Sequence, residues 1–376
     1  MVTLYYIYRF LNFFETIVSK SEVKEVEVSQ ELAVCFHKIS ETLQNNANLL
    51  SGKISDKNRK TILDGLGQAG SSYRETIYNN GFSDSKTQLS LEAISSFIAI
   101  TKSYLEHSID SNKRNDNMYH AYNLMTVEND QEVSISYLSE MLEGQVAVLS
   151  SGYLSPTQAL SLLDGLKNSA LFREDQYSYI LYPNKELPRF DKKNTIPSEK
   201  VEQSTLLKKL VADGNRQVIE QDVTGKFHFN GNFNNAKSLE NALDNLDERY
   251  NALISSEKET LLQVFEDIFD HKSFTGRSGT FFGYEGLGSI YWHMVSKLVL
   301  AVQENCFRAI HTNATDEVIG RLLDHYYEIN AGIGVHKSPE LYGAFPTDPY
   351  SHTPATKGAQ QPGMTGQVKE DVLSRF

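Results

Sequence analysis

The chain has 376 residues, of which 40% are hydrophobic and 22% are charged, a composition that is typical of globular proteins. Its formal net charge of −12 argues against nucleic acid or an anionic membrane as a partner, because both need clustered Lys and Arg. The two cysteines, Cys35 and Cys306, form no disulfide framework and no zinc motif. We therefore expect buried thiols, no bound metal and a cytoplasmic protein.

The first 109 residues carry a nearly continuous helical pattern. Residues 1–18 are apolar and aromatic, but Arg9 and Glu15 interrupt them well short of a membrane span, so a core helix is expected. In residues 28–50, apolar side chains recur at three- and four-residue spacing, which predicts one buried helix face. The same pattern predicts helices over residues 57–71 and 88–108. Polar and turn residues then interrupt it.

Helical patterns also dominate the remainder of the chain. Residues 132–149 are expected to form a helix, and Ser155, Pro156 and Gln158 mark the start of the next one with a capping box. The alternation and glycines within residues 216–236 predict a short β-hairpin. Further helices are expected at residues 238–247, 256–270, 286–304 and 315–330.

This order of elements predicts a mainly α fold of stacked helical hairpins, as an open solenoid or as part or all of an (α/α) toroid. We expect an N-terminal helical region over residues 1–131 and a helical-hairpin region with the functional loops over residues 132–376. Both termini fall in apolar helical pattern. The chain is therefore expected to be a fragment of a longer polypeptide, whose missing portions would cover Tyr5, Ile7, Phe10, Val372 and Phe376.

A glycine-rich loop precedes one strongly apolar helix. Five glycines lie between residues 276 and 288, and glycines allow a ligand to approach the backbone closely. Arg277, Ser278 and Thr280 could hold a phosphate or sugar hydroxyls, since a helix N-terminus favours an anion. The alternative is a structural turn with a capped helix. The loop is neither a P-loop nor a dinucleotide-binding fingerprint.

Carboxylates in this loop and in a separate irregular loop suit acid catalysis. Glu285 lies among glycines and aromatic residues, where desolvation would raise its pKa, although an ordinary glutamate at a helix start fits equally. Asp175 lies in the loop REDQYSY at residues 173–179 and is a lesser candidate, with a surface ion pair as the alternative. Trp292 could stack on a sugar ring, but its helical spacing favours a core position.

The longest irregular stretch covers residues 332–370. It is poor in charge and contains Tyr342, Phe345 and Tyr350, so we expect residues 332–367 to form an ordered loop. Because the helices at 286–304 and 315–330 should be antiparallel, this loop is expected to line the same cleft as the glycine-rich loop. Asp348 is a second candidate acid. The candidate ligand-binding residues here are His336, Lys337, His352, Gln360 and Gln361. The alternative is a loop whose polar groups satisfy its own backbone. A metal site is not expected, because the spacing matches no known signature.

Residues 276–280, the glycines that follow and the helix that begins with Tyr291 and Trp292 resemble the active-site side of α/α-toroid, or six-hairpin, carbohydrate-active enzymes. The resemblance is to glycoside phosphorylases of the cellobiose-phosphorylase type and their hydrolase relatives. It covers residues 132–376. It implies that a carboxylic acid protonates the glycosidic oxygen while backbone, hydroxyl, Arg and His groups hold phosphate. No cofactor is implied apart from inorganic phosphate as a co-substrate.

Two functions remain open at this point. The first is an enzyme that phosphorolyses or hydrolyses the glycosidic bond of an oligosaccharide, with Glu285 or Asp348 as the general acid. The second is a non-catalytic helical module that binds a glycan or a protein. Carboxyl groups about 5–10 Å apart in one cleft would favour the enzyme. Carboxyl groups on opposite surfaces would favour the binding module.

Overall fold

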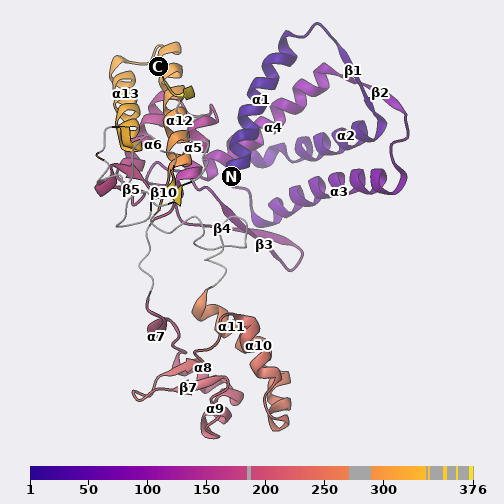
Figure 1. Cartoon of the computed structure of the whole chain (residues 1–376). Helices are drawn as coiled ribbons and strands as arrows, with labels where there is room; N and C mark the ends of the chain where they lie inside the picture. The colour runs from indigo at the N-terminus through magenta and orange to yellow at the C-terminus, as the bar shows by residue number, and fades with distance from the viewer. Residues whose placement is uncertain are drawn as a thin grey trace. The chain divides into compact units, whose positions relative to one another are not determined.

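The computed structural model describes residues 1–183, 188–270, 289–335, 338, 350–353, 361–362 and 372–375. The fold is mainly α, with stacked helices and short two- or three-stranded sheets, as the sequence predicts (Figure 1). The chain divides into a main unit, residues 1–184 with 285–376, and an inserted unit, residues 185–284. The boundary expected at residue 131 falls inside the main unit and stays a prediction.

The N-terminal layer of the main unit consists of helices with one face that is only half-buried. Its elements are α1 (Val2–Lys20), α2 (Gln30–Asn45), η1 (Ala47–Ser51), α3 (Asp56–Asn80), α4 (Leu91–Ser111) and the strands β1 (Glu25–Ser29) and β2 (Lys86–Ser90). Ser29, Ser55 and Ser90 cap α2, α3 and α4 by accepting a backbone N–H. The two strands pair antiparallel, which the helical pattern did not predict.

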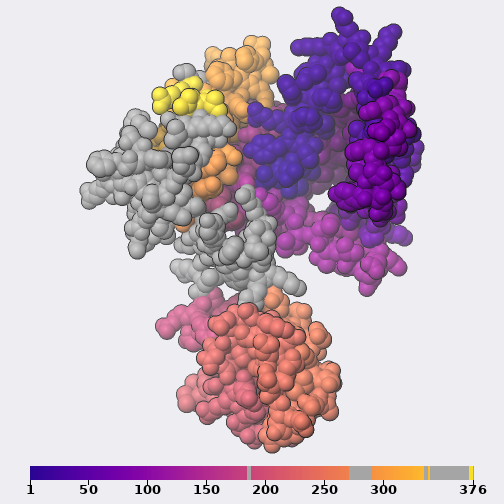
Figure 2. Space-filling model, turned by 45° about the vertical axis from the view of Figure 1, so that its right-hand side comes forward, coloured from indigo at the N-terminus to yellow at the C-terminus, as the bar shows by residue number. Residues whose placement is uncertain are grey.

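The termini bury less apolar surface than an ordinary core helix would. Ile7, Phe10 and Val372 are 42%, 57% and 64% exposed, as expected, and the N-terminal segment lies at the surface (indigo in Figure 2). The expectation was wrong for Tyr5, whose ring is fully buried and whose hydroxyl donates to the backbone oxygen of His120. Phe376 lies outside the described residues.

Residues 132–149 do not form the single helix that was predicted. They begin with β4 (Glu132–Tyr137), which pairs antiparallel with β3 (Asn123–Glu128), and only then continue into helix α5 (Leu142–Ser150). Asn129 and Asp130 turn the hairpin with φ angles of 49° and 55°. Two consecutive positive φ angles are typical of the tight hairpin turn whose twist matches the twist of the flanking strands. Asn and Asp tolerate these angles.

The densest part of the main unit is a pair of helical hairpins, which we call the two-hairpin layer. Its helices are α5, α6 (Pro156–Lys167), α12 (Trp292–His311) and α13 (Asp316–Asn330). The predicted capping box at Ser155 and Gln158 is confirmed. Fully buried Leu142, Leu162 and Leu298 lie in the core that these helices share.

Polar contacts fix the directions of these four helices. Asn305 in the second half of α12 donates to the backbone oxygen of Leu149 at the end of α5. At the other end, Leu142 at the start of α5 and Ser289 before α12 both bond to the backbone of Leu181, so α5 and α12 run the same way.

Asp164 on α6 accepts from Arg321 and contacts His325 on α13. Further along both helices, Lys167 lies 3.2 Å from Glu328, so α6 and α13 also run the same way. One end of the layer therefore holds the starts of α5 and α12 and the ends of α6 and α13. We call it the loop end.

The inserted unit has a core of its own. Its elements are α7 (Phe190–Lys193), α8 (Ser198–Gln203), α9 (Thr205–Ala212), β7 (Ile219–Gln221), β8 (Phe227–Phe229), α10 (Ala236–Asp244), η3 (Glu248–Tyr250) and α11 (Asn251–Phe269). The hairpin predicted in residues 216–236 is confirmed as β7 and β8. Phe229 and Phe265 stack edge-on at 5.1 Å inside the core.

Within the described residues, no helix is both long and apolar enough to cross a membrane. Cys306 is fully buried, as expected, and burial raises the pKa of its thiol to about 11. Cys35 is only half-buried on α2, because α2 packs less closely than α12.

Candidate functional site

The loop end is held together by backbone hydrogen bonds between segments that are distant in sequence. The N–H of Leu142, at the start of α5, donates to the oxygen of Leu181 at 3.0 Å. The N–H of Leu181 in turn donates to the oxygen of Ser289 at 3.2 Å. The chain therefore leaves the two-hairpin layer just after Leu181 and returns to the adjacent position at Ser289, with the inserted unit between them.

A small three-stranded sheet lies next to the start of α12. Strand β9 (Ile290–Tyr291) follows the glycine-rich loop directly, and β10 (Tyr350–Thr353) comes from the long C-terminal loop. They pair antiparallel, with His352 opposite Tyr291, and β11 (Gln361–Pro362) pairs with the other edge of β10. The described strand β10 of the C-terminal stretch thus lies beside β9, at the start of α12.

The predicted loop at residues 173–179 is a tight hairpin at the same end. It comprises β5 (Phe172–Arg173), η2 (Glu174–Gln176) and β6 (Ser178–Tyr179). The π-helical turn η5 (Ala331–Val335) follows α13 and packs against it. A Cβ atom built on Gly332 would lie 2.1 Å from the backbone oxygen of Tyr177, so only glycine fits there.

Asp175 forms the surface ion pair that was the alternative to a catalytic role. Its two carboxylate oxygens accept from Nε and Nη2 of Arg173 at 2.7 and 2.9 Å. The Asp175 side chain is 59% exposed, whereas that of Arg173 is 11% exposed. Arg173 is therefore anchored in the protein and presents Asp175 toward solvent. Such two-pronged pairing fixes the orientation of both groups.

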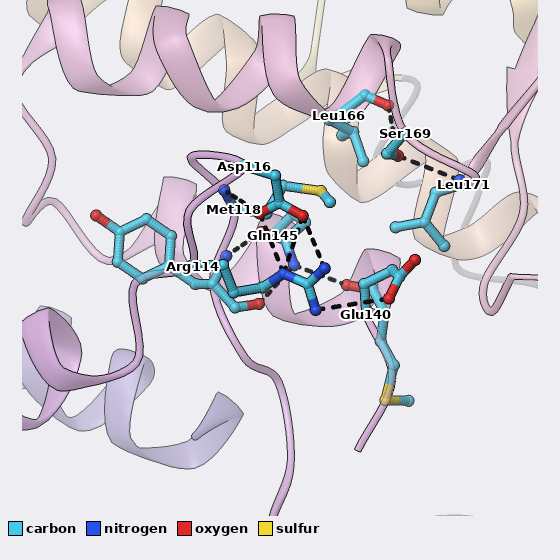
Figure 3. Close-up of polar contacts among 10 residues, drawn as sticks. Arg114, Asp116, Met118, Glu140, Gln145, Leu166, Ser169 and Leu171 are labelled. Carbon is cyan, nitrogen blue, oxygen red and sulfur yellow. Dashed lines mark hydrogen bonds and ion pairs between the residues drawn. The ribbon is translucent and has the colours of Figure 1, made fainter. Parts of the chain in front are cut away.

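A second ionic cluster braces the segment that leads into α5 (Figure 3). Arg114 donates to Asp116 through Nε and Nη2, the shorter contact being 2.7 Å, and lies 3.5 Å from a carboxylate oxygen of Glu140. Burial opposes ionisation of Asp116, but hydrogen bonds from Arg114 and from the N–H of Met118 outweigh it and lower the pKa of Asp116. Figure 3 also shows that these residues lie toward Gln145 of α5.

Buried hydrogen bonds hold the neighbouring backbone. The Gln145 side chain accepts from the N–H of Tyr119 at 2.9 Å and donates to the oxygens of Tyr119 and Met141. Just after the end of α6, the Ser169 hydroxyl donates to the backbone oxygen of Leu166 and accepts from the N–H of Leu171. Because these amide and hydroxyl groups are satisfied within the protein, the segments flanking the loop end have fixed positions.

The remaining predicted site residues divide into three groups. Trp292 is fully buried in the core, in agreement with the alternative proposed for it, and shows no ring face to a ligand. For His352 and Gln361 the structure gives the backbone, on facing strands of one sheet. The other candidates lie outside the described residues: Arg277, Ser278, Thr280, Glu285, His336, Lys337, Asp348 and Gln360.

The sequence did not single out Glu143, which the structure places in the first turn of α5 at the loop end. Its carboxylate accepts from the hydroxyl of Tyr122 at 2.7 Å, and both side chains are half-buried. An acidic residue in the first turn of a helix was the available signal. The expected helix start at residue 132 concealed it, because Glu143 then fell in the helix interior.

A comparison with protein-family models matches one segment of the chain. Residues 187–272 match the model of GH149 phosphorylase insertion domain 2. The matched segment coincides with the inserted unit, which is bounded structurally at residues 185 and 284. The match therefore relates the chain to GH149 phosphorylases over this one region. A search of the curated proteins finds no match to the chain.

Proposed function

We propose that the chain is a glycoside phosphorylase, or a part of one, that cleaves a glycosidic bond of an oligosaccharide with inorganic phosphate. One observation carries the proposal: the segment that matches a phosphorylase insertion domain leaves and rejoins the two-hairpin layer at hydrogen-bonded positions, Leu181 and Ser289. An insertion with adjacent ends interrupts its host without disturbing the host's packing. The remainder of the main unit would then be the catalytic host domain, an (α/α) toroid or part of one.

The proposed reaction needs an acid and a phosphate site. The acid donates a proton to the glycosidic oxygen, the bond from that oxygen to the anomeric carbon breaks, and a phosphate oxygen bonds to the same carbon. Glu285 and Asp348 are the proposed acids, because each precedes a strand of the β9–β10 pair by a few residues. Arg277, Ser278 and Thr280 are the proposed phosphate ligands.

Asp175 is better suited to positioning than to proton donation. Both of its oxygens accept hydrogen bonds from Arg173, which an ionised carboxylate does best. An ionised, exposed carboxylate at the loop end would accept hydrogen bonds from sugar hydroxyls. Lys337, His336, His352 and the glutamines Gln360 and Gln361 complete the proposed substrate site. A cytoplasmic location belongs to the same proposal, because inorganic phosphate is the second substrate.

The proposal is tested by incubating the chain with disaccharides and trisaccharides of glucose, mannose and galactose, with and without phosphate. Sugar phosphate released only when phosphate is present is the expected result. The variants Glu285→Gln and Asp348→Asn identify the acid, because the active one should lose activity by about 100-fold or more. Glu259→Gln, on the exposed surface of α11, is the matched control and should retain activity.

Other outcomes would reject it. Free sugar released at the same rate without phosphate would indicate a hydrolase. Binding of an oligosaccharide without any product would indicate the alternative, a non-catalytic glycan-binding module. A chain that neither binds nor cleaves any sugar of the panel would remove the carbohydrate assignment.

A further inference from the structure

One residue at the loop end has an unusual backbone conformation. Tyr177 has φ 49° and ψ 36°, which is the left-handed helical region. The other described non-glycine residues with positive φ are all Asn or Asp: Asp84, Asn117, Asn129, Asp130, Asp270 and Asn313. Asn and Asp are tolerated there because their short side chains bond to the local backbone, whereas a bulky ring is a genuine outlier.

Contacts from several segments hold this conformation. The N–H of Tyr177 donates to the oxygen of Glu174 at 3.1 Å, and strands β5 and β6 pair on either side of it. The backbone of Gly332 lies against the carbonyl oxygen of Tyr177. The Arg173–Asp175 ion pair closes the turn. Because the backbone is held from several sides, the direction in which the Tyr177 side chain leaves the hairpin is fixed as well.

The hairpin exposes a distinct set of groups. Tyr177 is 60% exposed, while its neighbours Gln176 and Ser178 are 5% and 1% exposed. Glu174 and Asp175 are exposed beside it. The tip therefore presents one aromatic ring and two carboxylates. A sugar ring has an apolar C–H face and a rim of hydroxyl donors, so an aromatic face next to carboxylate acceptors matches both of its surfaces.

We propose that Tyr177 is a sugar-stacking residue of the substrate site, and that its left-handed conformation aims the ring at the bound oligosaccharide. The inference rests on the proposed carbohydrate function. Strained conformations that the surroundings enforce are concentrated at ligand-binding positions, and the inference proceeds from the observed outlier to the function. Asn or Gly at this position would satisfy the turn without strain but would supply no ring.

The test separates the ring from the turn. In Tyr177→Asn the left-handed turn is favoured and the ring is lost, whereas Tyr177→Phe keeps the ring and removes only the hydroxyl. We expect Tyr177→Asn to weaken oligosaccharide binding, measured by calorimetry on the sugar panel, by about tenfold. Its Tm should be unchanged or higher by about 2 °C. Tyr177→Phe should bind within about twofold of wild type.

The control is Tyr78→Ala, which removes an 80% exposed tyrosine on α3, away from the loop end, and should leave binding unchanged. Unchanged affinity in Tyr177→Asn would overturn the inference while leaving the phosphorylase proposal intact. A lowered Tm in Tyr177→Asn, with an equal loss of affinity in Tyr177→Phe, would show a structural role and also overturn it. Wild-type protein that binds and cleaves no sugar would reject both proposals.

Discussion

Helices α12 and α3 are of similar length, yet they are used very differently. α12 buries twelve of its 20 residues, including Trp292 and Leu298. α3 has 25 residues, and Ala69 alone among them is buried. The periodic pattern is amphipathic in both. Helix length therefore does not indicate which part of the fold is most stable. The loop end is built on the helices of the main unit that bury the largest share of their residues.

The N-terminal layer is attached to the two-hairpin layer partly through polar contacts. Arg9 on α1 donates to Glu304 on α12 at 2.8 Å and to the backbone oxygen of Ser150 at 2.9 Å. The hydroxyl of Tyr153 donates to Asp110 at 2.7 Å. Exposed ion pairs contribute about 0–1 kcal/mol each. Substitutions at exposed positions of the N-terminal layer should therefore cost much less than substitutions in the core of the two-hairpin layer.

The largest expected effect is in the core of α12. Leu298→Ala removes a fully buried side chain and should lower the free energy of unfolding by about 2–5 kcal/mol, because the cavity cannot collapse. Leu32→Ala on α2, where leucine is 45% exposed, should change it by no more than about 0.5 kcal/mol. Urea denaturation of both variants measures the difference. Equal losses would break the comparison between the layers.

The next effect concerns the contact between η5 and the β5–β6 hairpin. Gly332→Ala forces a methyl group against the Tyr177 carbonyl and should destabilise the main unit by about 1–3 kcal/mol. Gly320→Ala on α13 meets no neighbour within 4 Å and should stabilise by about 0.5–1 kcal/mol. Thermal unfolding monitored by circular dichroism separates the two. A tolerated Gly332→Ala would show that the hairpin is free to shift.

A smaller effect is expected in the inserted unit. Glu257 accepts from the Ser204 hydroxyl at 2.5 Å and from the N–H groups of Thr205 and Leu206 at the start of α9. Glu257→Gln should cost about 1–2 kcal/mol through weaker capping. The exposed Glu259→Gln should cost nothing measurable. Hydrogen exchange should show faster opening of residues 188–270 alone; faster exchange of residues 289–335 would mean that the two units are coupled.

The smallest effect depends on pH. Asp222, at the tip of the β7–β8 hairpin, accepts hydrogen bonds from the hydroxyl of Thr224 and from the N–H of Lys226. These bonds, the Thr224 hydroxyl first, lower the pKa of Asp222 well below its ordinary value. A depressed pKa stabilises the fold above pH ~4, and this contribution is lost as the pH falls further.

Asp222→Asn should therefore lower the Tm of the inserted unit at pH 7, and the difference from wild type should shrink by pH 3. The exposed Glu220→Gln on the same hairpin is the control. Scanning calorimetry at the two pH values measures the difference. A difference that stays constant between pH 7 and pH 3 would contradict this assignment.

Periodicity and capping signals predicted much of this fold. Residues 315–330 were expected to form a helix, and α13 covers 316–330, with Thr315 as its cap. The Ser155–Gln158 capping box and the 219–229 hairpin were also read correctly. These features depend on local chemistry, such as side-chain capping and residue alternation, which a short window of sequence contains.

The failures have a different cause. The alternation of Val133 and Ile135 after Asn129–Asp130 was a hairpin signal that the surrounding helical pattern obscured. Strands β1 and β2 pair across some sixty residues, which no local window reveals. The left-handed conformation of Tyr177 could not be predicted, because tertiary contacts impose it against the preference of the residue.

The hydrogen bond between Leu181 and Ser289 also has a kinetic consequence. Closing this contact in an unfolded chain means joining the ends of a loop of about a hundred residues, with the entropy loss of a long closure. If the inserted unit folds first around its own core, the loop becomes a compact body with short tails, and closure is faster. Variants that unfold the inserted unit should thus slow the refolding of α12 onto α5, even where the final stability of that pair is unchanged.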